Sequence, residues 1–122
     1  MNNEEILTRV KNSLKIVKSK MNEILNVIDN PKIECIEKSL WKIAEELEFS
    51  ASLISITFGL GDYYPDLKDL KKTTLTKIIN DLRDSLDKIE KIIDSDPKES
   101  YNIIRSVIHK TRAIQSNLKS YF

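Results

Sequence analysis

The side chains that most often catalyse reactions or bind metals are few and scattered in this sequence. The chain holds a single histidine, His109, and a single cysteine, Cys35. One of each is too few for a closed zinc site, which needs four ligands. Glu45, Glu46 and Glu48 lack the Glu-x-x-His partners of a di-iron bundle, and no Gly-x-Ser-x-Gly nucleophile setting occurs. We therefore expect no enzymatic activity, no cofactor and no small-molecule substrate.

Arg105 and His109 lie four residues apart and so share one face of a helix. The pair resembles the Arg…His pair of HEPN-type ribonucleases, which implies RNA cleavage. That family usually leaves at least four residues between the two and has a polar residue after the arginine, and this chain departs from both features. A surface or boundary histidine is the simpler interpretation of His109.

A more regular pattern of candidate binding residues lies at residues 115–122 (QSNLKSYF). Gln115, Leu118, Tyr121 and Phe122 follow one another in the order Gln-x-x-Leu-x-x-Tyr-Phe. Residues three and four apart share a helix face, so the three apolar side chains can form one plug. Aromatic side chains that fill a desolvated pocket usually supply most of the affinity of a short docking peptide.

This segment resembles the PIP box, the motif by which client proteins dock on the sliding clamp PCNA. The motif consists of Gln, two free residues, an aliphatic residue, two free residues and two aromatic residues, and the chain fills all four defined positions. The resemblance implies that the plug enters a hydrophobic pocket on the clamp while Gln115 binds at an adjacent site. It implies a partner, PCNA, and with it a DNA polymerase or another clamp client.

The same segment also continues the apolar stripe of the helix before it, so it can be interpreted as the last turn of a core helix. We therefore expect a helical domain over residues 1–114 and a motif over residues 115–122 that is either free or a continuation of the fourth helix. The stripe consists of Ile104, Val107, Ile108, Thr111, Ile114, Leu118 and Phe122.

Four segments carry apolar residues at alternating steps of three and four, the spacing of amphipathic helices. Turn-forming glycines and prolines lie between these segments or at their starts. Four such helices with short connections favour an all-α fold, an antiparallel up-down-up-down four-helix bundle. The expected helices cover roughly Asn3–Ile28, Pro31–Phe58, Thr73–Asp94 and Pro97 to the tail.

Capping signals mark two of the helix starts. Asn30 is expected to cap the second helix, with Pro31 as its first residue. Asp96 is expected to cap the fourth, since a proline follows it and a glutamate stands at the capping-box position. Between the second and third helices we expect a loop followed by an amphipathic turn, over Gly59–Pro65 and Pro65–Lys71.

Three features of the second helix predict burial. Cys35, between Ile33 and Ile36, is expected to be a packed core thiol. Trp41 flanks the apolar stripe and is expected at the boundary of the core, with an exposed interaction anchor as the alternative. The uncharged stretch Phe49–Gly61 is too short to span a bilayer and is expected to be buried helix.

Basic residues gather on the first and last helices. Residues 9–20 and 101–122 contain basic side chains and no acid. Because the first and last helices of a simple bundle are usually neighbours, the two could share a positive side that attracts nucleic-acid phosphates. The candidate contacts are Arg9, Lys11, Lys15, Lys18, Arg105, Lys110 and Arg112.

Size and composition limit the number of domains, the cellular location and the source that we expect. A chain of 122 residues with 40% hydrophobic residues and a formal net charge of +1 suits one ordered domain. The acidic, polar N-terminus is unlike a targeting segment, and the lone cysteine excludes an intrachain disulfide, so we expect a cytoplasmic protein without membrane contact. Few glycines and abundant charged residues fit a thermophilic, archaeal source, which would suit a PCNA clamp.

The sequence thus favours a non-enzymatic, PCNA-binding adaptor or accessory subunit in DNA replication or repair. The alternative is a small helical subunit that binds nucleic acid within a nucleoprotein complex, such as a CRISPR effector. The first function depends on residues 115–122, and the second depends on the basic side chains.

Overall fold

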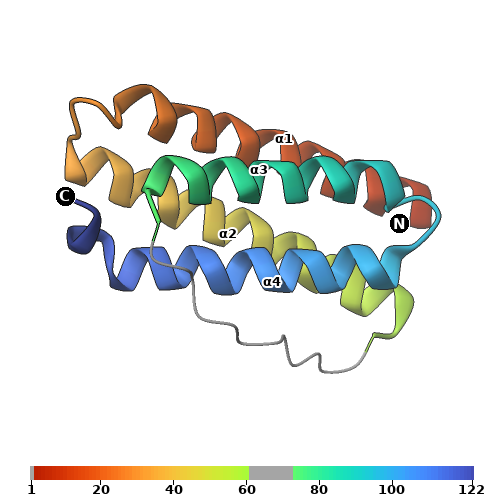
Figure 1. Cartoon of the computed structure of the whole chain (residues 1–122). Helices are drawn as coiled ribbons and strands as arrows, with labels where there is room; N and C mark the ends of the chain where they lie inside the picture. The colour runs from red at the N-terminus through yellow and green to blue at the C-terminus, as the bar shows by residue number, and fades with distance from the viewer. Residues whose placement is uncertain (1, 61–72) are drawn as a thin grey trace.

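The computed structural model describes residues 2–60 and 73–122, which form four α-helices, a short 3-10 helix and no strand. The helices pack side by side as a bundle (Figure 1), so the expected all-α four-helix bundle is confirmed. In chain order the elements are α1 (Asn3–Val27), α2 (Ile33–Phe58), α3 (Leu75–Ile92), α4 (Pro97–Ser116) and η1 (Leu118–Tyr121).

Each helix turns one apolar stripe toward a common core. The stripe predicted for the third helix is buried at every position, because steps of three and four residues keep one face of a helix inward. Thr111 is the polar member of the α4 stripe, and its buried hydroxyl donates to the carbonyl of Val107 at 2.8 Å. The buried α3 stripe consists of Leu75, Ile79, Leu82, Leu86, Ile89 and Ile93.

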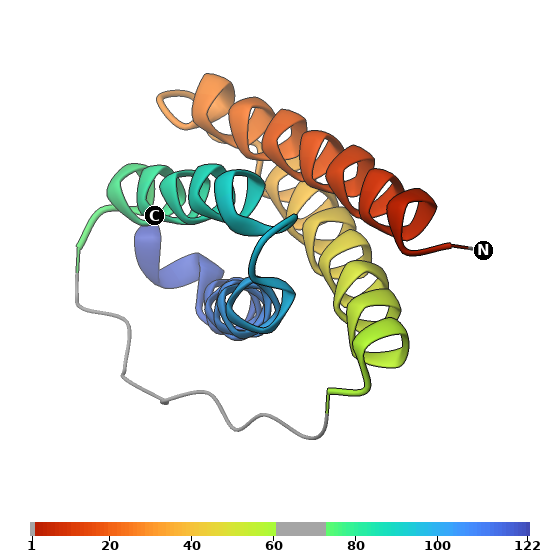
Figure 2. The same ribbon diagram turned by 90° about the vertical axis from the view of Figure 1, so that its right-hand side faces the viewer.

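The four helices follow an order around the bundle that differs from their order in the chain. α1 packs on α2 and α3, and α4 packs on the same two helices. An end-on view shows α1 and α4 on one diagonal of the bundle and α2 and α3 on the other (Figure 2). The first and last helices are therefore not neighbours.

Contacts between side chains define the helix directions. Lys11 near the start of α1 pairs with Asp94, just after the end of α3, so α1 and α3 are antiparallel. The Ser13 hydroxyl donates to Glu46, further along α2, and Glu23, later in α1, contacts Ser39 earlier in α2, so α1 and α2 are antiparallel too. α2 and α3 consequently run in the same direction.

The directions in chain order are up, down, down, up, which differs from the expected up-down-up-down succession. All four neighbouring pairs are antiparallel, but α2 ends and α3 begins at opposite ends of the bundle (Figure 1). The expectation assumed short connections throughout, whereas residues 59–74 separate these two helices. The predicted turn Pro65–Lys71 and most of the predicted loop lie outside the described residues.

The helix ends confirm one predicted cap and correct the other. The carboxylate of Asp96 accepts the backbone N–H of Glu99 at 3.1 Å, as predicted for the start of α4. The prediction for Asn30 is wrong: α2 begins after Lys32, which forms no side-chain cap. Asn30 instead closes the turn that ends α1, because its backbone N–H donates to the carbonyl of Val27.

Gly59 ends α2 in the left-handed conformation, with φ of 63°. The N–H of the next residue, Leu60, donates to the carbonyl of Ser55 at 3.0 Å, and the Ser55 hydroxyl donates back to the Leu60 carbonyl at 2.9 Å. Glycine adopts this backbone at no steric cost, which explains why the helix stops at this residue.

The three burial predictions for α2 are wrong in part or whole. Cys35 is exposed, and Trp41 is 66% exposed. Each adjoins a buried residue, but one step along a helix turns a side chain by about 100° away from the core. The stretch that begins at Phe49 buries its inner side only, since Phe49 and Ile56 are exposed.

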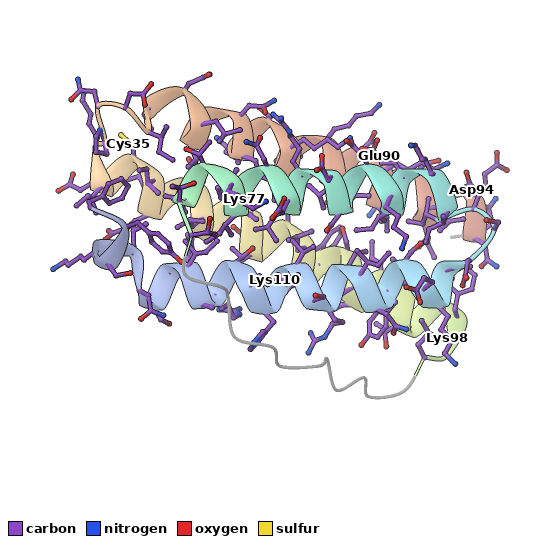
Figure 3. The ribbon with its side chains drawn as sticks, viewed as in Figure 1. Cys35, Lys77, Glu90, Asp94, Lys98 and Lys110 are labelled. Atoms are coloured by element: carbon purple, nitrogen blue, oxygen red, sulfur yellow. The ribbon has the colours of Figure 1, made fainter. Side chains whose placement is uncertain are left out.

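Ion pairs between α1 and α3 lie along one edge of the bundle. The ammonium of Lys18 lies 2.8 Å from Glu90 and also pairs with Asp87. Glu90 of α3, and Asp94 just after the end of α3, lie on the side nearest α1 (Figure 3). Burial would lower the pKa of Lys18, but hydrogen bonds to both carboxylates raise it above its ordinary 10.5. The hydrogen bond from Lys18 in turn lowers the pKa of Asp87.

Replacing Lys18 with Met should lower the melting temperature at neutral pH and have a smaller effect in acid. The folded-state pKa of Asp87 is below its ordinary 3.8, so its stabilising contribution is complete above that value and is lost as pH falls through the folded pKa. Thermal unfolding between about pH 7 and about pH 2 should show that the difference in melting temperature between Lys18→Met and wild type becomes smaller below about pH 4.

Lys88→Met, at an exposed position of α3, is the matched control, and its melting temperature should differ little from that of wild type at any pH. If Lys18→Met lowers the melting temperature by the same amount across the whole pH range, that result would contradict the ion-pair explanation. It would indicate lost packing of the lysine stem instead.

Candidate docking site at the C-terminus

The C-terminal segment separates from α4 shortly after Gln115. α4 ends at Ser116, Asn117 is its C-cap, and η1 follows as a separate short turn. The Asn117 amide donates to the backbone carbonyl four residues earlier at 3.0 Å, and the Ser120 hydroxyl donates to the Asn117 carbonyl at 2.6 Å. The predicted motif is therefore divided, with Gln115 on α4 and the other three residues on or just after η1.

The structure distributes the four motif residues between the core and the surface. Leu118 is 4% exposed and belongs to the core, and the half-buried Tyr121 packs against it. Phe122 is 49% exposed, and Gln115 is half-buried. The three apolar side chains therefore do not form a free plug, and the core-helix interpretation fits Leu118 but not Phe122.

The change of helix type explains this division. In an α-helix, residues four apart share a face, so Phe122 would follow Leu118 into the core. In a 3-10 helix, residues three apart are aligned instead. Tyr121 therefore lies on the same side as Leu118, and Phe122 is rotated toward solvent. The sequence pattern alone does not indicate this change.

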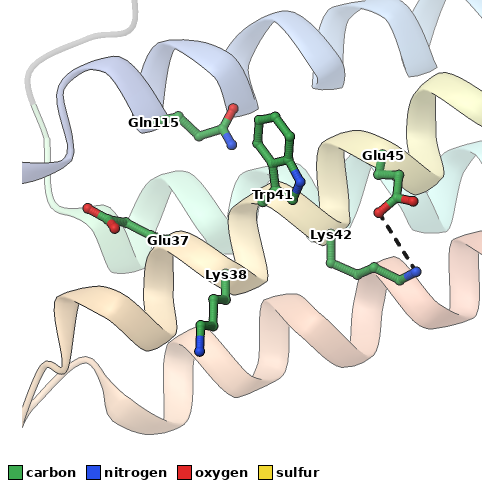
Figure 4. Close-up of a pocket in the computed structure, with 6 residues that line it drawn as sticks. All are labelled: Glu37, Lys38, Trp41, Lys42, Glu45 and Gln115. Carbon is green, nitrogen blue, oxygen red and sulfur yellow. Dashed lines mark ion pairs between the residues drawn. The ribbon is translucent and has the colours of Figure 1, made fainter.

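Gln115 also borders a groove between α4 and α2. Its side chain extends toward Trp41 of α2, as Figure 4 shows. The ammonium of Lys42, on α2, lies 3.1 Å from the carboxylate of Glu46 and 3.9 Å from that of Glu45. The groove combines an amide, an indole and charged side chains. Its lining consists of Glu37, Lys38, Trp41, Lys42, Glu45 and Gln115.

The basic candidates do not gather on one side, so the predicted shared positive surface of the first and last helices is wrong. α1 and α4 are diagonal, and carboxylates of the helices between them pair with three of the seven residues. Lys11 pairs with Asp94, Lys18 with Asp87 and Glu90, and Arg112 with Glu48. The remaining candidates are the exposed Arg9 and Lys15 and the half-buried Arg105 and Lys110.

Arg105 and His109 lie one turn apart on α4, and both are half-buried. The Arg105 Nε is buried and has no hydrogen-bond partner within the described ranges. Across residues 2–60 and 73–122, no three His, Cys, Asp or Glu side chains are grouped closely enough to hold a metal ion. The absence of enzymatic activity stays a prediction.

No protein-family model matches the chain, and comparisons with curated proteins and with solved structures gave no significant match. None of the helices that the structure describes is long and apolar enough to cross a membrane.

Leu118→Ala should lower the free energy of unfolding by about 2–4 kcal/mol, because it leaves a cavity in the core. Phe122→Ala should change it by less than about 1 kcal/mol, since half of that side chain is already in water. Urea denaturation followed by circular dichroism measures both. Equally small effects would contradict the burial of Leu118.

Proposed function

We propose that the chain is a non-enzymatic docking protein that binds a PCNA-type sliding clamp through residues 115–122. It would serve as an adaptor or accessory subunit in DNA replication or repair, together with a polymerase or another clamp client. The observation that carries the proposal is a complete Gln-x-x-Leu-x-x-Tyr-Phe pattern on a terminal turn that has left α4, with Phe122 directed to solvent.

The two ends of the motif are available for a first contact. Phe122 offers an aromatic anchor outside the core, and aromatic anchors dominate the affinity of small interfaces. Gln115 is half-exposed beside the Trp41 groove, so its amide can still reach a polar site on a partner. A partner can therefore engage both residues before the fold changes.

Complete docking of the plug requires the terminal turn to leave the bundle. Leu118 is in the core and Tyr121 packs against it, so a clamp pocket must replace these intramolecular contacts with its own. Exposing a buried leucine costs about 2 kcal/mol. A hydrophobic pocket on the clamp offsets that cost, because the side chain is buried again in the complex. The net affinity then depends on the aromatic residues.

Isothermal titration calorimetry with the sliding clamp of the source organism tests the proposal. Wild type should bind, and Phe122→Ala should weaken binding by about tenfold or more, as expected for an aromatic anchor. Lys119→Ala, at an exposed free position of the motif, is the matched control and should bind like wild type.

Circular dichroism should show that Phe122→Ala keeps the helical signal and the melting temperature of wild type, because the side chain is outside the core. Absence of binding by wild type would refute clamp docking. Equal affinities of wild type and Phe122→Ala would refute the assignment of the site to the C-terminal segment.

A further inference from the structure

The outer face of α2 exposes large apolar side chains to solvent. Trp41 is 66% exposed, Phe49 is 46% exposed and Ile56 is 82% exposed. A step of seven residues turns a helical side chain by only about 20°, so Phe49 and Ile56 are nearly aligned on α2. The step of eight from Trp41 to Phe49 turns it by about 80°, so Trp41 lies on the same half of the helix surface but toward α4 (Figure 4). An amphipathic helix of a soluble domain normally carries polar residues there. We call these three residues the α2 outer row.

The second half of α2 lacks the charges that normally keep such a face in water. Residues 49–58 (FSASLISITF) contain no charged side chain. The bundle buries the inner residues Ala51 and Ile54, whereas Phe49 and Ile56 stay in contact with solvent. Several large apolar side chains exposed on the same half of one helix are typical of an interaction site. The uncharged sequence of this stretch predicted a buried helix, and the bundle buries only one side of it.

The spacing of the α2 outer row fits a second copy of the same chain. Phe49 follows Trp41 by eight residues and precedes Ile56 by seven, which is about 12 Å and about 10.5 Å along the helix axis. A two-fold axis through Phe49, perpendicular to α2, places Trp41 of each copy opposite Ile56 of the other. An isologous interface requires such a self-complementary pattern.

The charges on α2 are compatible with this antiparallel pairing. Between Trp41 and Thr57, the stretch that the two-fold axis pairs with itself, the charged residues are Lys42, Glu45, Glu46 and Glu48. Ion pairs of Lys42 with Glu45 and Glu46, and of Glu48 with Arg112 of α4, balance these charges within each copy. Glu45 comes level with the region of Ser52, whose hydroxyl can donate to the carboxylate.

The area is also sufficient for a specific contact. A large aromatic side chain buries roughly 150–250 Å², so the α2 outer row offers on the order of 400 Å² per copy at the observed exposures. Together with the stems of the polar residues between, two copies approach the roughly 1,000 Å² of a specific interface. That area suits a reversible dimer rather than an obligate one.

We propose that the outer face of α2 is a homodimer interface, in which two copies pair antiparallel about Phe49. Phe49 packs against Phe49 of the second copy, and Trp41 packs against Ile56 of the second copy at both ends. The interface uses residues of α2 and none of the C-terminal segment, although Trp41 borders the groove that Gln115 also lines.

Sedimentation equilibrium between about 1 and about 300 μM tests the dimer, since an interface of this area suits micromolar affinity. The mass should rise from 14.1 kDa toward twice that value. Trp41 is the only tryptophan, so its emission should shift to shorter wavelength over the same concentrations. Ile56→Lys should weaken dimerisation by about tenfold or more, because it buries a charge in the interface. Thr76→Lys, which adds the same charge at an exposed position of α3, should dimerise like wild type.

Cross-linking tests the register. In a Cys35→Ser background, Ser52→Cys at an exposed position of α2 should give covalent dimers with a short bismaleimide, because position 52 of each copy lies three residues, about 4.5 Å along the helix, from the axis. Thr76→Cys in the same background, at an exposed position of α3, should give no covalent dimers.

Two results would overturn the proposal. The first is a monomeric mass at every concentration, and the second is a dimer that Ile56→Lys leaves unchanged.

Discussion

Burial of one continuous apolar stripe on each of four helices is the constraint on which the rest of this structure depends. α2 joins α1 to α4, and α3 closes the ring on the other side. The core already holds the neighbouring helices together, and ion pairs such as that between Lys18 and Glu90 form across their edges. Partly exposed pairs contribute less than apolar burial, so they reinforce the helix pairing rather than create it.

The same constraint divides the C-terminal segment. Leu118 occupies the last core position of the α4 stripe and also the aliphatic position of the docking motif, and one side chain cannot fill both places at once. The change to 3-10 geometry after Asn117 keeps Tyr121 beside Leu118 and turns Phe122 outward. In the proposed docking, affinity for the clamp would be coupled to the stability of the last turn, because binding would compete with intramolecular packing.

α2 departs from the simple amphipathic pattern because apolar side chains occupy both its inner and its outer sides. The inner side, including Ile54, belongs to the core, and the α2 outer row is in contact with solvent. Trp41 stands where the outer row meets the groove that Gln115 borders. The α2 surface and the C-terminal segment are therefore adjacent in space although they are far apart in the chain.

The sequence by itself determined the four helices, nearly all of the core and the Asp96 cap, because helical periodicity and capping are local properties. It also revealed the motif residues, but not their division between core and surface. Only the tertiary structure decided that α1 and α4 are diagonal, since an apolar stripe fits several neighbours and the path of the whole chain selects among them. It likewise placed Trp41 in solvent and turned Phe122 outward, because a rotation of about 100° at the edge of a stripe, or a change of helix type, moves a side chain from core to surface.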